Sequence, residues 1–438
     1  MMTDKIYPKN VLETLSKYML VDGFDLVFDG EKSHGSFLYD SKHNREYLDF
    51  FTFFASSPIG FNHPEMKSDE FIKKIGKVSI HKPSNSDIYT VEMAEFVDTF
   101  AKIAKPDFMK YLFFVSGGAL AVENALKTAF DWKIRKNLKK GKEEKGTKVI
   151  HFRHAFHGRS GYTLSLTNTF DPRKTKYFPK FDWPRVDSPA LNFPVDDDEI
   201  KRVEKEEERV LNQIKDIISK DGDDIAALII EPIQAEGGDR HFRKEFFKKL
   251  REITLESEIM FILDEVQTGM GLTGKFWCFE HFDFQPDIVA FGKKSQICGI
   301  MCSDRVEEVE NHVFAESSRI NSTWGGNLTD MVRSTKILEI IDKEQLVDNA
   351  KNVGEFLLEN LRGIKSEKLS NIRGRGLMIA FDLENTEKRD RMFEKLFENG
   401  LFTIKCGEKS IRFRPPLNLS KEEALKGVEI VKKSLTEI

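Results

Sequence analysis

Two apolar runs, each followed by a charged side chain, decide the fold: EIMFILDEVQTG at residues 258–269 and PDIVAFGKK at residues 286–294. The first run leads into Asp264, and the second leads into Lys293 and Lys294. Short continuous apolar runs of this kind are typical of strands that are buried on both faces. The sequence therefore predicts two core strands, with a carboxylate after one and a lysine after the other.

A carboxylate and a lysine in these positions are what an enzyme that uses pyridoxal 5'-phosphate (PLP) requires. The acid keeps the pyridine nitrogen protonated, and the lysine amine forms a Schiff base with the aldehyde. Each residue alone is a weak signal, since an Asp at a strand end is often a turn or cap residue. Together they predict a PLP site with Asp264 and a lysine, Lys293 or Lys294, as catalytic residues.

The rest of the chain predicts an α/β fold with a large domain and a smaller one. Apolar runs alternate with amphipathic helical stretches, which favours a mainly parallel sheet. The predicted strands cover residues 111–115, 149–152, 225–230, 259–263 and 288–291. A long helical pattern after residue 327 and a strand over 373–381 indicate a small C-terminal α+β domain. We expect residues 1–55 to join the small domain, 56–328 to form the large domain and 329–438 the small one.

Composition narrows the functional class. The chain has 438 residues and a net charge of −4, so nothing favours binding to nucleic acid or to an anionic membrane. No apolar run approaches the ~20 residues of a membrane helix, and residues 1–8 lack the apolar core of a signal peptide. The four cysteines have no Cys-x-x-Cys spacing. These features predict a cytoplasmic protein.

Two charged stretches need no functional role: residues 136–145 are expected to form an exposed loop, and 196–209 the acidic start of a helix.

Two glycine-containing turns are candidates for cofactor contacts. Gly118 and Ala119 follow a strand and begin a helix, so their bare backbone N–H groups could hold a phosphate; an ordinary strand-to-helix turn is the alternative. Phe156 could stack on the pyridine ring, and Arg159 offers a planar fork for a carboxylate. Histidines recur at every third position from His151 to His157, but without flanking acids they predict no metal site.

The remaining candidates surround the two core strands. Val266 would cover the second ring face and Gln267 would reach the ring hydroxyl. Glu236 is placed near the substrate, because Gly-Gly beyond it lets the loop fold over a site. Thr323 offers a hydroxyl for the phosphate. Arg412 lies in an alternating stretch ended by prolines, which predicts an edge strand, and could bind a substrate carboxylate or be an exposed edge charge.

These segments together resemble the class III (omega) aminotransferases, a PLP fold-type I group. The most specific match is residues 263–275, with Pro286-Asp287 and the lysine behind it. Residues 291–299 and 321–327 are most similar to the branch that acts on the ε-amino group of lysine. Leu120 and Phe156 depart from the usual Glu and Tyr of the wider group and agree with that branch.

The resemblance implies a function and roles for the candidate residues. The family spacing from Pro286 favours Lys293 over Lys294. The expected reaction moves the ε-amino group of L-lysine to 2-oxoglutarate, giving 2-aminoadipate 6-semialdehyde, which cyclises to piperideine-6-carboxylate, and glutamate. Glu236 would pair with Arg412 while lysine reacts, then swing away so that Arg412 takes the α-carboxylate of 2-oxoglutarate. Arg159 would hold the distal carboxylate.

The resemblance also implies a homodimer in which Thr323 acts across the interface on the partner subunit's cofactor. Three alternatives stay open. The substrate could be ornithine, 4-aminobutyrate (GABA) or another ω-amino acid, because one methylene more or less is worth only ~1–3 kcal/mol in a pocket. An aminomutase or racemase could use the same fold without a carboxylate switch. A binding module without chemistry would have no reason to keep both Asp264 and Lys293.

Overall fold

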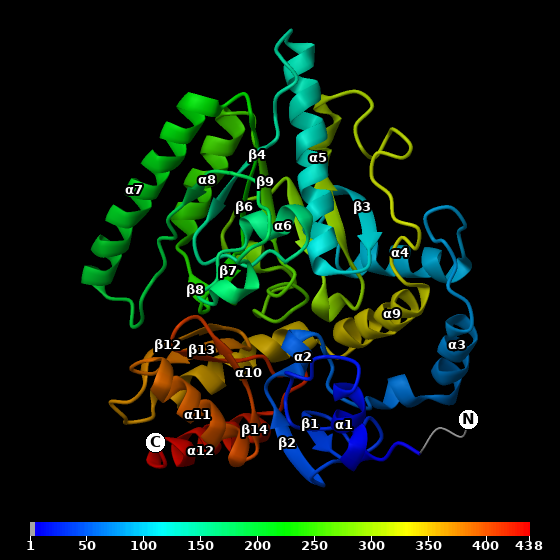
Figure 1. Ribbon diagram of the computed structural model, residues 1–438, viewed down its shortest axis with the longest axis vertical. Coiled ribbons are helices and arrows are strands. Elements are labelled where there is room, and N and C mark those ends of the chain that lie inside the picture. The colour runs from blue at the N-terminus through cyan, green and yellow to red at the C-terminus, as the bar shows by residue number, and fades with distance from the viewer. Residues whose placement is uncertain (1–4) are drawn as a thin grey trace.

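A seven-stranded sheet is the centre of the structure, a computed structural model that describes residues 5–438 (Figure 1). Its strand order is β3-β11-β10-β9-β6-β4-β5. β11 is antiparallel to both neighbours and the other pairs are parallel, so the predicted mainly parallel sheet is confirmed. The five predicted strands correspond to β3, β4, β6, β9 and β10. The strands span Met109–Val115 (β3), Lys148–Phe152 (β4), Arg185–Val186 (β5), Ile225–Ile230 (β6), Met260–Asp264 (β9), Ile288–Phe291 (β10) and Cys298–Ser303 (β11).

The sequences of the central strands are continuously apolar because helices cover both faces of the sheet. In β9, Met260 and Ile262 belong to the core that includes α5 (Gly118–Lys139). Phe261 and Leu263 point to the other core, which includes α8 (Lys244–Glu256). All four β9 side chains are fully buried, so neither face can carry the polar residues that would create an alternating pattern.

The parallel pairing of β9 with β10 brings the two charged residues to one edge of the sheet. Asp264 is the last residue of β9 and lies opposite Ala290 of β10. Lys293 follows three residues later, just beyond the end of the same strand. The acid and the lysine, distant in sequence, therefore emerge side by side.

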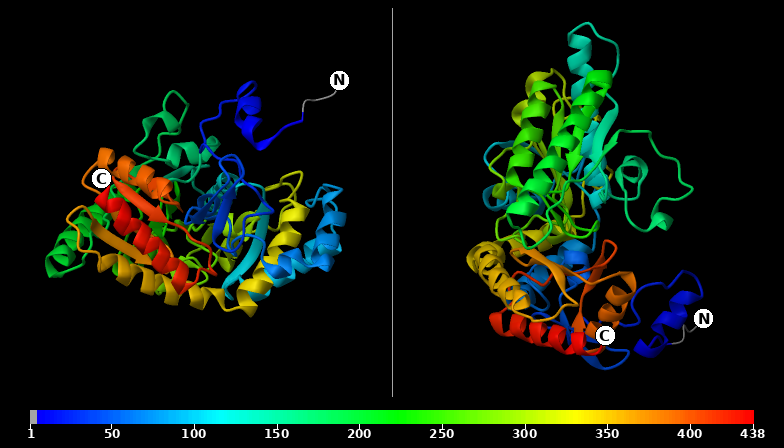
Figure 2. Two further views of the ribbon diagram at one scale, coloured as in Figure 1. Left: turned by 90° about the horizontal axis from the view of Figure 1, so that it is seen from below. Right: turned by 90° about the vertical axis from the view of Figure 1, so that its left-hand side faces the viewer.

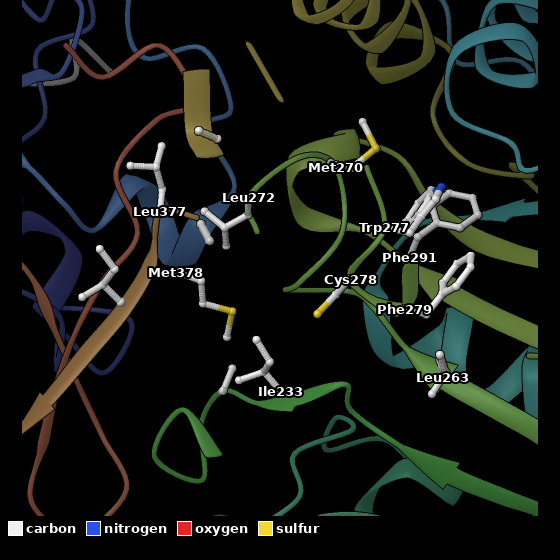
Figure 3. Packing of buried hydrophobic residues seen from close by; sticks show 14 of the residues in the cluster. Ile233, Leu263, Met270, Leu272, Trp277, Cys278, Phe279, Phe291, Leu377 and Met378 are labelled. Carbon is white, nitrogen blue, oxygen red and sulfur yellow. The ribbon is translucent and has the colours of Figure 1, made fainter. Parts of the chain in front are cut away.

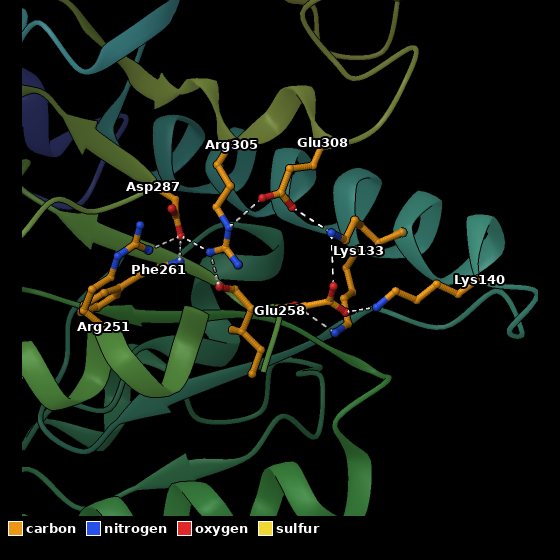
Figure 4. Close-up of polar contacts among 10 residues, drawn as sticks. Lys133, Lys140, Arg251, Glu258, Phe261, Asp287, Arg305 and Glu308 are labelled. Carbon is orange, nitrogen blue, oxygen red and sulfur yellow. Dashed lines mark hydrogen bonds and ion pairs between the residues drawn. The ribbon is translucent and has the colours of Figure 1, made fainter. Parts of the chain in front are cut away.

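The opposite ends of these strands are fixed by a buried carboxylate (Figure 4). Asp287, just before β10, is fully buried and its Oδ2 accepts a hydrogen bond from the Phe261 backbone N–H at 2.8 Å. The same oxygen contacts Arg251 at 2.8 Å and Arg305 at 2.7 Å. Two guanidinium groups and an N–H compensate the buried charge, so this network sets the register of β10 against β9.

Further helices surround the sheet. Asp196 caps α7 by accepting from the Glu199 N–H at 2.8 Å, which confirms the predicted acidic helix start. The predicted loop over 136–145 is wrong for its first four residues, because α5 continues to Lys139. The Asn137 side chain donates to the carbonyls of Lys145 and Asp223, which ties the helix end to its surroundings. The remaining helices span Asp69–Ser79 (α3), Val91–Ile103 (α4), Gly161–Leu166 (α6) and Asp197–Asp221 (α7). Among the helices of residues 5–438, none combines the length and the hydrophobicity that a membrane-spanning helix needs.

The C-terminal part contains a second, antiparallel sheet with the order β12-β13-β16-β15, together with helices that Figure 2 shows packed below the large sheet. It is the smaller α+β unit that the sequence predicts. Its strands span Ser370–Arg375 (β12), Met378–Asp382 (β13), Ile404–Cys406 (β15) and Ser410–Phe413 (β16). Its helices span Leu328–Lys343 (α9), Leu346–Arg362 (α10), Thr386–Glu398 (α11) and Lys421–Thr436 (α12).

Two predictions about this part are wrong. The single strand over 373–381 is a hairpin, because Gly376 has a φ of +55° and reverses the chain between β12 and β13. The predicted edge strand β16 lies inside the sheet, where Arg412 sits between Ala380 and Ile404. Arg412 is only 3% exposed, so it is not a surface charge at a sheet edge.

The N-terminal segment pairs with the C-terminal part. β2 is antiparallel to β1 and parallel to β14, which follows α11. These strands span Phe37–Asp40 (β1), Arg45–Asp49 (β2) and Leu401–Phe402 (β14), and the helices here span Val11–Ser16 (α1) and Thr52–Ala55 (α2). Single turns of 3-10 helix span Pro8–Asn10 (η1), Pro64–Lys67 (η2), Pro172–Lys174 (η3), Cys278–His281 (η4), Lys293–Ser295 (η5) and Asp304–Glu308 (η6).

The predicted domain boundaries at residues 55 and 328 stay a prediction. The first predicted segment, 1–55, and the stretch 1–8 that was considered for a signal peptide both include residues 1–4, which lie outside the described residues.

One hydrophobic core continues from the large sheet into the C-terminal part (Figure 3). Leu263 of β9 and Trp277 from the loop that follows belong to the same buried cluster as Leu377 and Met378 of the β12–β13 turn. The backbone of this turn is also bound directly, because the Leu377 N–H donates to the Leu272 carbonyl at 2.9 Å. The loop after Asp264 therefore packs between the two units and fixes their relation.

The turn at Gly376 gives a test of this junction. A Cβ on Gly376 would lie 2.4 Å from the Thr273 carbonyl carbon, and the left-handed φ adds strain. We expect Gly376→Ala to lower the free energy of unfolding by at least about 2 kcal/mol, measured by urea denaturation. The control is Gly363→Ala, whose new Cβ would meet no atom closer than 3.4 Å. Equal stability of the two variants would contradict the tight junction.

Candidate active site

A cavity of about 490 Å³ opens at the carboxyl edge of the large sheet, where β9 and β10 end. The predicted site residues that line it are Gly118, Ala119, Phe156, Glu236, Asp264, Val266, Gln267 and Lys293. Residues that the sequence did not single out for the site complete the wall: Ser56, His157, Gly158, Glu231, Gln296 and Cys298. Most of the candidates thus meet in one place, although they come from segments far apart in the chain.

Lys293 presents its amine to this cavity, whereas Lys294 does not. Burial lowers the pKa of Lys293 to about 7; the positive charge of Arg412 adds to this effect and Asp264 opposes it. The backbone of Lys293 has a φ of +52°, a strained value of the kind that collects at functional sites. Lys294 is turned away and donates to the Ala55 carbonyl at 3.0 Å, so the geometry favours Lys293 as the reactive lysine.

Asp264 is held by a histidine. Its Oδ2 accepts from His157 Nδ1 at 2.8 Å, and its Oδ1 accepts from the Val266 N–H at 3.1 Å. The His157 and Asp264 side chains are almost completely buried, so their contact is not screened by water. The sequence pattern raised His157 only as a possible metal ligand. Its position directly after the candidate ring-stacking residue Phe156 could have indicated that it belongs to the site.

Glu231 connects the two loops that approach Asp264. Its carboxylate accepts from the Phe156 N–H at 2.9 Å and from the Ala235 N–H at 3.1 Å. Burial raises the pKa of Glu231 to about 7; the nearby charge of His157 opposes this effect and that of Asp264 adds to it. Both carboxylate oxygens are bound to backbone, so Glu231 is a structural clamp and not a free acid.

The walls of the cavity suit a flat ring that carries an anionic group. Gly117, with a φ of +114°, precedes α5, whose first turn contains Gly118 and Ala119 and no acidic residue. Bare N–H groups and the positive end of the helix dipole therefore face the cavity. A Cβ on Gly118 would lie 2.9 Å from Val266 Cγ1, so only glycine allows this close approach. Phe156 and Val266 supply two apolar walls.

Glu236 and Arg412 do not pair with each other in this structure. Glu236 Oε1 lies 2.5 Å from Lys174 Nζ. Arg412 Nη1 donates to Gln267 Oε1 at 3.1 Å, and the same oxygen accepts from Arg414 Nε at 3.1 Å. Arg412 therefore lies behind Gln267, which lines the cavity, and its Nε is buried without a partner among the described residues.

Besides Arg412, two further predicted residues lie outside the cavity formed by this chain. Arg159 and Thr323 are exposed, and the Thr323 carbonyl accepts from Ser84 Oγ at 2.6 Å. In the loop after Glu236, Gly237 is buried, and a Cβ there would lie 2.1 Å from the His154 carbonyl oxygen. The glycine therefore permits close packing of this loop beside the site.

This combination of fold and site defines a PLP-dependent transferase. The chain matches the family model Aminotransferase class-III over residues 20–435, and it belongs to that family. It is 49% identical to an L-lysine-epsilon aminotransferase of Mycobacterium tuberculosis over 98% of this chain and 96% of the relative. A similar protein of that name from Amycolatopsis lactamdurans is 44% identical over 98% of this chain and 96% of its own length. The solved structure of a lysine aminotransferase from M. tuberculosis, in its internal aldimine form, superposes with a TM-score of 0.96 at 48% identity, covering 99% of this chain and 100% of that one.

The residues present fit the cofactor of this family, PLP. Lys293 offers a buried amine with a lowered pKa, and Asp264 offers a carboxylate held in place by His157. Gly118 and Ala119 offer backbone N–H groups for a phosphate. The Lys293 amine therefore suits the aldehyde of PLP, the Asp264 carboxylate suits its ring nitrogen, and the N–H groups of Gly118 and Ala119 suit its phosphate.

The titration of Lys293 predicts a pH-dependent stability of the cofactor-free protein. Its pKa is about 7 when folded and 10.5 in its ordinary state, so the unfolded chain binds more protons between these values and stability rises with pH across this window. Lys293→Met removes the cost of burying the amine. We expect the variant to be more stable than the wild type, by an amount about 2 kcal/mol smaller at pH 9 than at pH 7.

Urea denaturation of the cofactor-free proteins at both pH values measures this difference. Lys409→Met, at an exposed lysine, is the control and should show no such trend. An advantage of Lys293→Met that does not change with pH would contradict the lowered pKa.

Proposed function

We propose that this protein transfers the ε-amino group of L-lysine to 2-oxoglutarate, releasing 2-aminoadipate 6-semialdehyde and glutamate. The observation that carries this proposal is the 49% identity to an L-lysine-epsilon aminotransferase over nearly the whole length of both chains. The cavity supports it, because the buried Lys293 and the buried Asp264 line it together, and Arg412 lies directly behind the lining residue Gln267.

In this proposal Lys293 and Asp264 carry the chemistry. PLP, when bound, supplies an aldehyde that condenses with amines and a ring that accepts an electron pair. Lys293 would hold the cofactor through its amine and would move a proton as a neutral base, a task suited by a pKa of about 7. Asp264 keeps the ring nitrogen protonated, and His157 orients the carboxylate at 2.8 Å. Gly118 and Ala119 would bind the phosphate, Phe156 and Val266 would cover the two ring faces, and Gln267 would reach the ring hydroxyl.

The two substrates pose different recognition problems at the same place. The methylene chain of lysine passes the position where 2-oxoglutarate carries a carboxylate next to its reacting carbon. When lysine is bound, Glu236 pairs with Arg412 and neutralises its charge. When 2-oxoglutarate is bound, Glu236 moves away and Arg412 binds the α-carboxylate. Arg159 binds the distal carboxylate. The low exposure of Arg412 supports this assignment, since a desolvated guanidinium binds a carboxylate more strongly than an exposed one.

A homodimer that completes the site is part of the proposal. Thr323 and Arg159 are exposed in the single chain although both are assigned to the site. An apolar surface next to this region supports burial by a partner subunit: Ile88, Tyr89 and Val91 are 64%, 76% and 71% exposed. A cytoplasmic location is also proposed, supported by four free cysteines.

Isotope transfer tests the proposed reaction directly. With [ε-15N]lysine and 2-oxoglutarate we expect 15N-labelled glutamate, whereas [α-15N]lysine should give unlabelled glutamate. Label transferred from the α-position would contradict the assignment of the reacting amine. Consumption of lysine without any labelled glutamate would favour an aminomutase or racemase.

The switch predicts unequal effects of Glu236→Ala on the two half-reactions. Without its acid, Arg412 faces the methylene chain of lysine as an unpaired charge, while its access to 2-oxoglutarate is unimpaired. We expect the lysine half-reaction to slow about tenfold and the 2-oxoglutarate half-reaction to change less, measured by stopped-flow absorbance. Equal losses in both half-reactions would exclude the switch.

A further inference from the structure

Lys174 forms an ion pair with Glu236, a residue that lines the candidate active site, and the proposed mechanism does not use this pair. It lies at the end of η3, in the segment after α6 that protrudes from the large sheet in Figure 2. Its Nζ contacts Glu236 Oε1 at 2.5 Å and lies 6.0 Å from the ring centroid of Phe156. Lys174 therefore reaches the acid of the proposed switch from outside the sheet.

Among residues 5–438, no acidic side chain pairs with Arg412. Arg412 donates to the neutral amide oxygen of Gln267, and its Nε has no partner among the described residues. None of the ion pairs within residues 5–438 that involve Glu236 includes Arg412. This arrangement suits the binding of 2-oxoglutarate, because Arg412 has no acidic partner among the described residues and the competing carboxylate of Glu236 is held by Lys174.

Only the side chain of Glu236 is free to change partner. Its backbone carbonyl accepts from the Gly407 N–H at 2.9 Å, and the preceding Ala235 N–H is bound by Glu231. The Lys174 and Glu236 side chains are 30% and 22% exposed. An ion pair with this much contact with water is held weakly, so a side-chain rotation can exchange it for another cation.

We propose that Lys174 is the alternative partner of Glu236 and thereby a positioning residue for the second substrate. By holding the carboxylate of Glu236 away from Arg412, Lys174 keeps the arginine available for the α-carboxylate of 2-oxoglutarate. The inference rests on the proposed function, since it assigns the second position of the same switch. It gives Lys174 no contact with the reacting atoms.

Binding of glutarate isolates this effect from catalysis. Glutarate carries the two carboxylates of 2-oxoglutarate but no keto group, so it binds without reacting. In Lys174→Met, Glu236 loses its alternative partner and competes for Arg412. We expect the glutarate Kd of the PLP-loaded variant to rise about fivefold, measured by isothermal titration calorimetry.

Two further variants separate this role from a structural one. Lys176→Met removes an exposed lysine of the same segment and should leave the Kd unchanged. In the double variant Lys174→Met/Glu236→Gln, the neutral amide no longer competes, so affinity should return to that of Glu236→Gln alone. A wild-type Kd in Lys174→Met, or a double variant as weak as Lys174→Met, would overturn the inference.

The outcome can be distinguished from failure of the proposed function. Glutarate binding does not depend on the amino donor, so the Kd values report on Lys174 whatever the donor is. Wild-type protein that transfers nitrogen from lysine while Lys174→Met binds glutarate normally would refute only the role of Lys174. Wild-type protein that neither transfers nitrogen from lysine nor binds glutarate would refute the proposed function instead.

Discussion

The removal of the Lys293 amine from water, beside the carboxylate of Asp264, is the constraint on which the site depends. An ammonium group in that position costs free energy, which is why burial brings the pKa of Lys293 to about 7. The cost is tolerated because the parallel strands β9 and β10 hold both residues at one edge of a sheet covered on both faces. The Asp287 network at the opposite ends of these strands keeps their register fixed.

The second unit of the chain is attached to this edge through buried charges. Arg414, directly after β16, is fully buried and paired with Asp239 from the loop after Glu236. Its Nε also donates to Gln267, and its carbonyl accepts from Thr52 Oγ1 at 2.5 Å. One arginine thus connects the N-terminal segment, the loop that carries Glu236 and the loop that follows Asp264. Breaking such a buried pair leaves an uncompensated charge, so these segments are expected to move together.

Much of this arrangement could be predicted from the sequence, and the failures have physical causes. The core strands were visible because burial on both faces makes their apolar runs continuous. The strand at Arg412 was misplaced at a sheet edge because its arginines and prolines suggest exposure, whereas hydrogen bonds from Arg412 to Gln267 and from Arg414 to Asp239 hold both guanidinium groups inside the fold. His157 and Lys174 were missed because their partners, Asp264 and Glu236, are distant in sequence. Nothing in a local pattern reports such contacts.

The central claim is that this cavity holds PLP on Lys293 and accepts the amine of lysine. The most direct measurement is the visible absorbance of the purified protein before and after adding L-lysine without a keto acid. The account predicts a yellow protein that loses its colour with lysine and responds only slowly to ornithine or 4-aminobutyrate, and a Lys293→Met variant that lysine does not bleach. A protein that stays colourless after PLP is added, or a yellow one that ignores lysine and responds to another ω-amine, would contradict it.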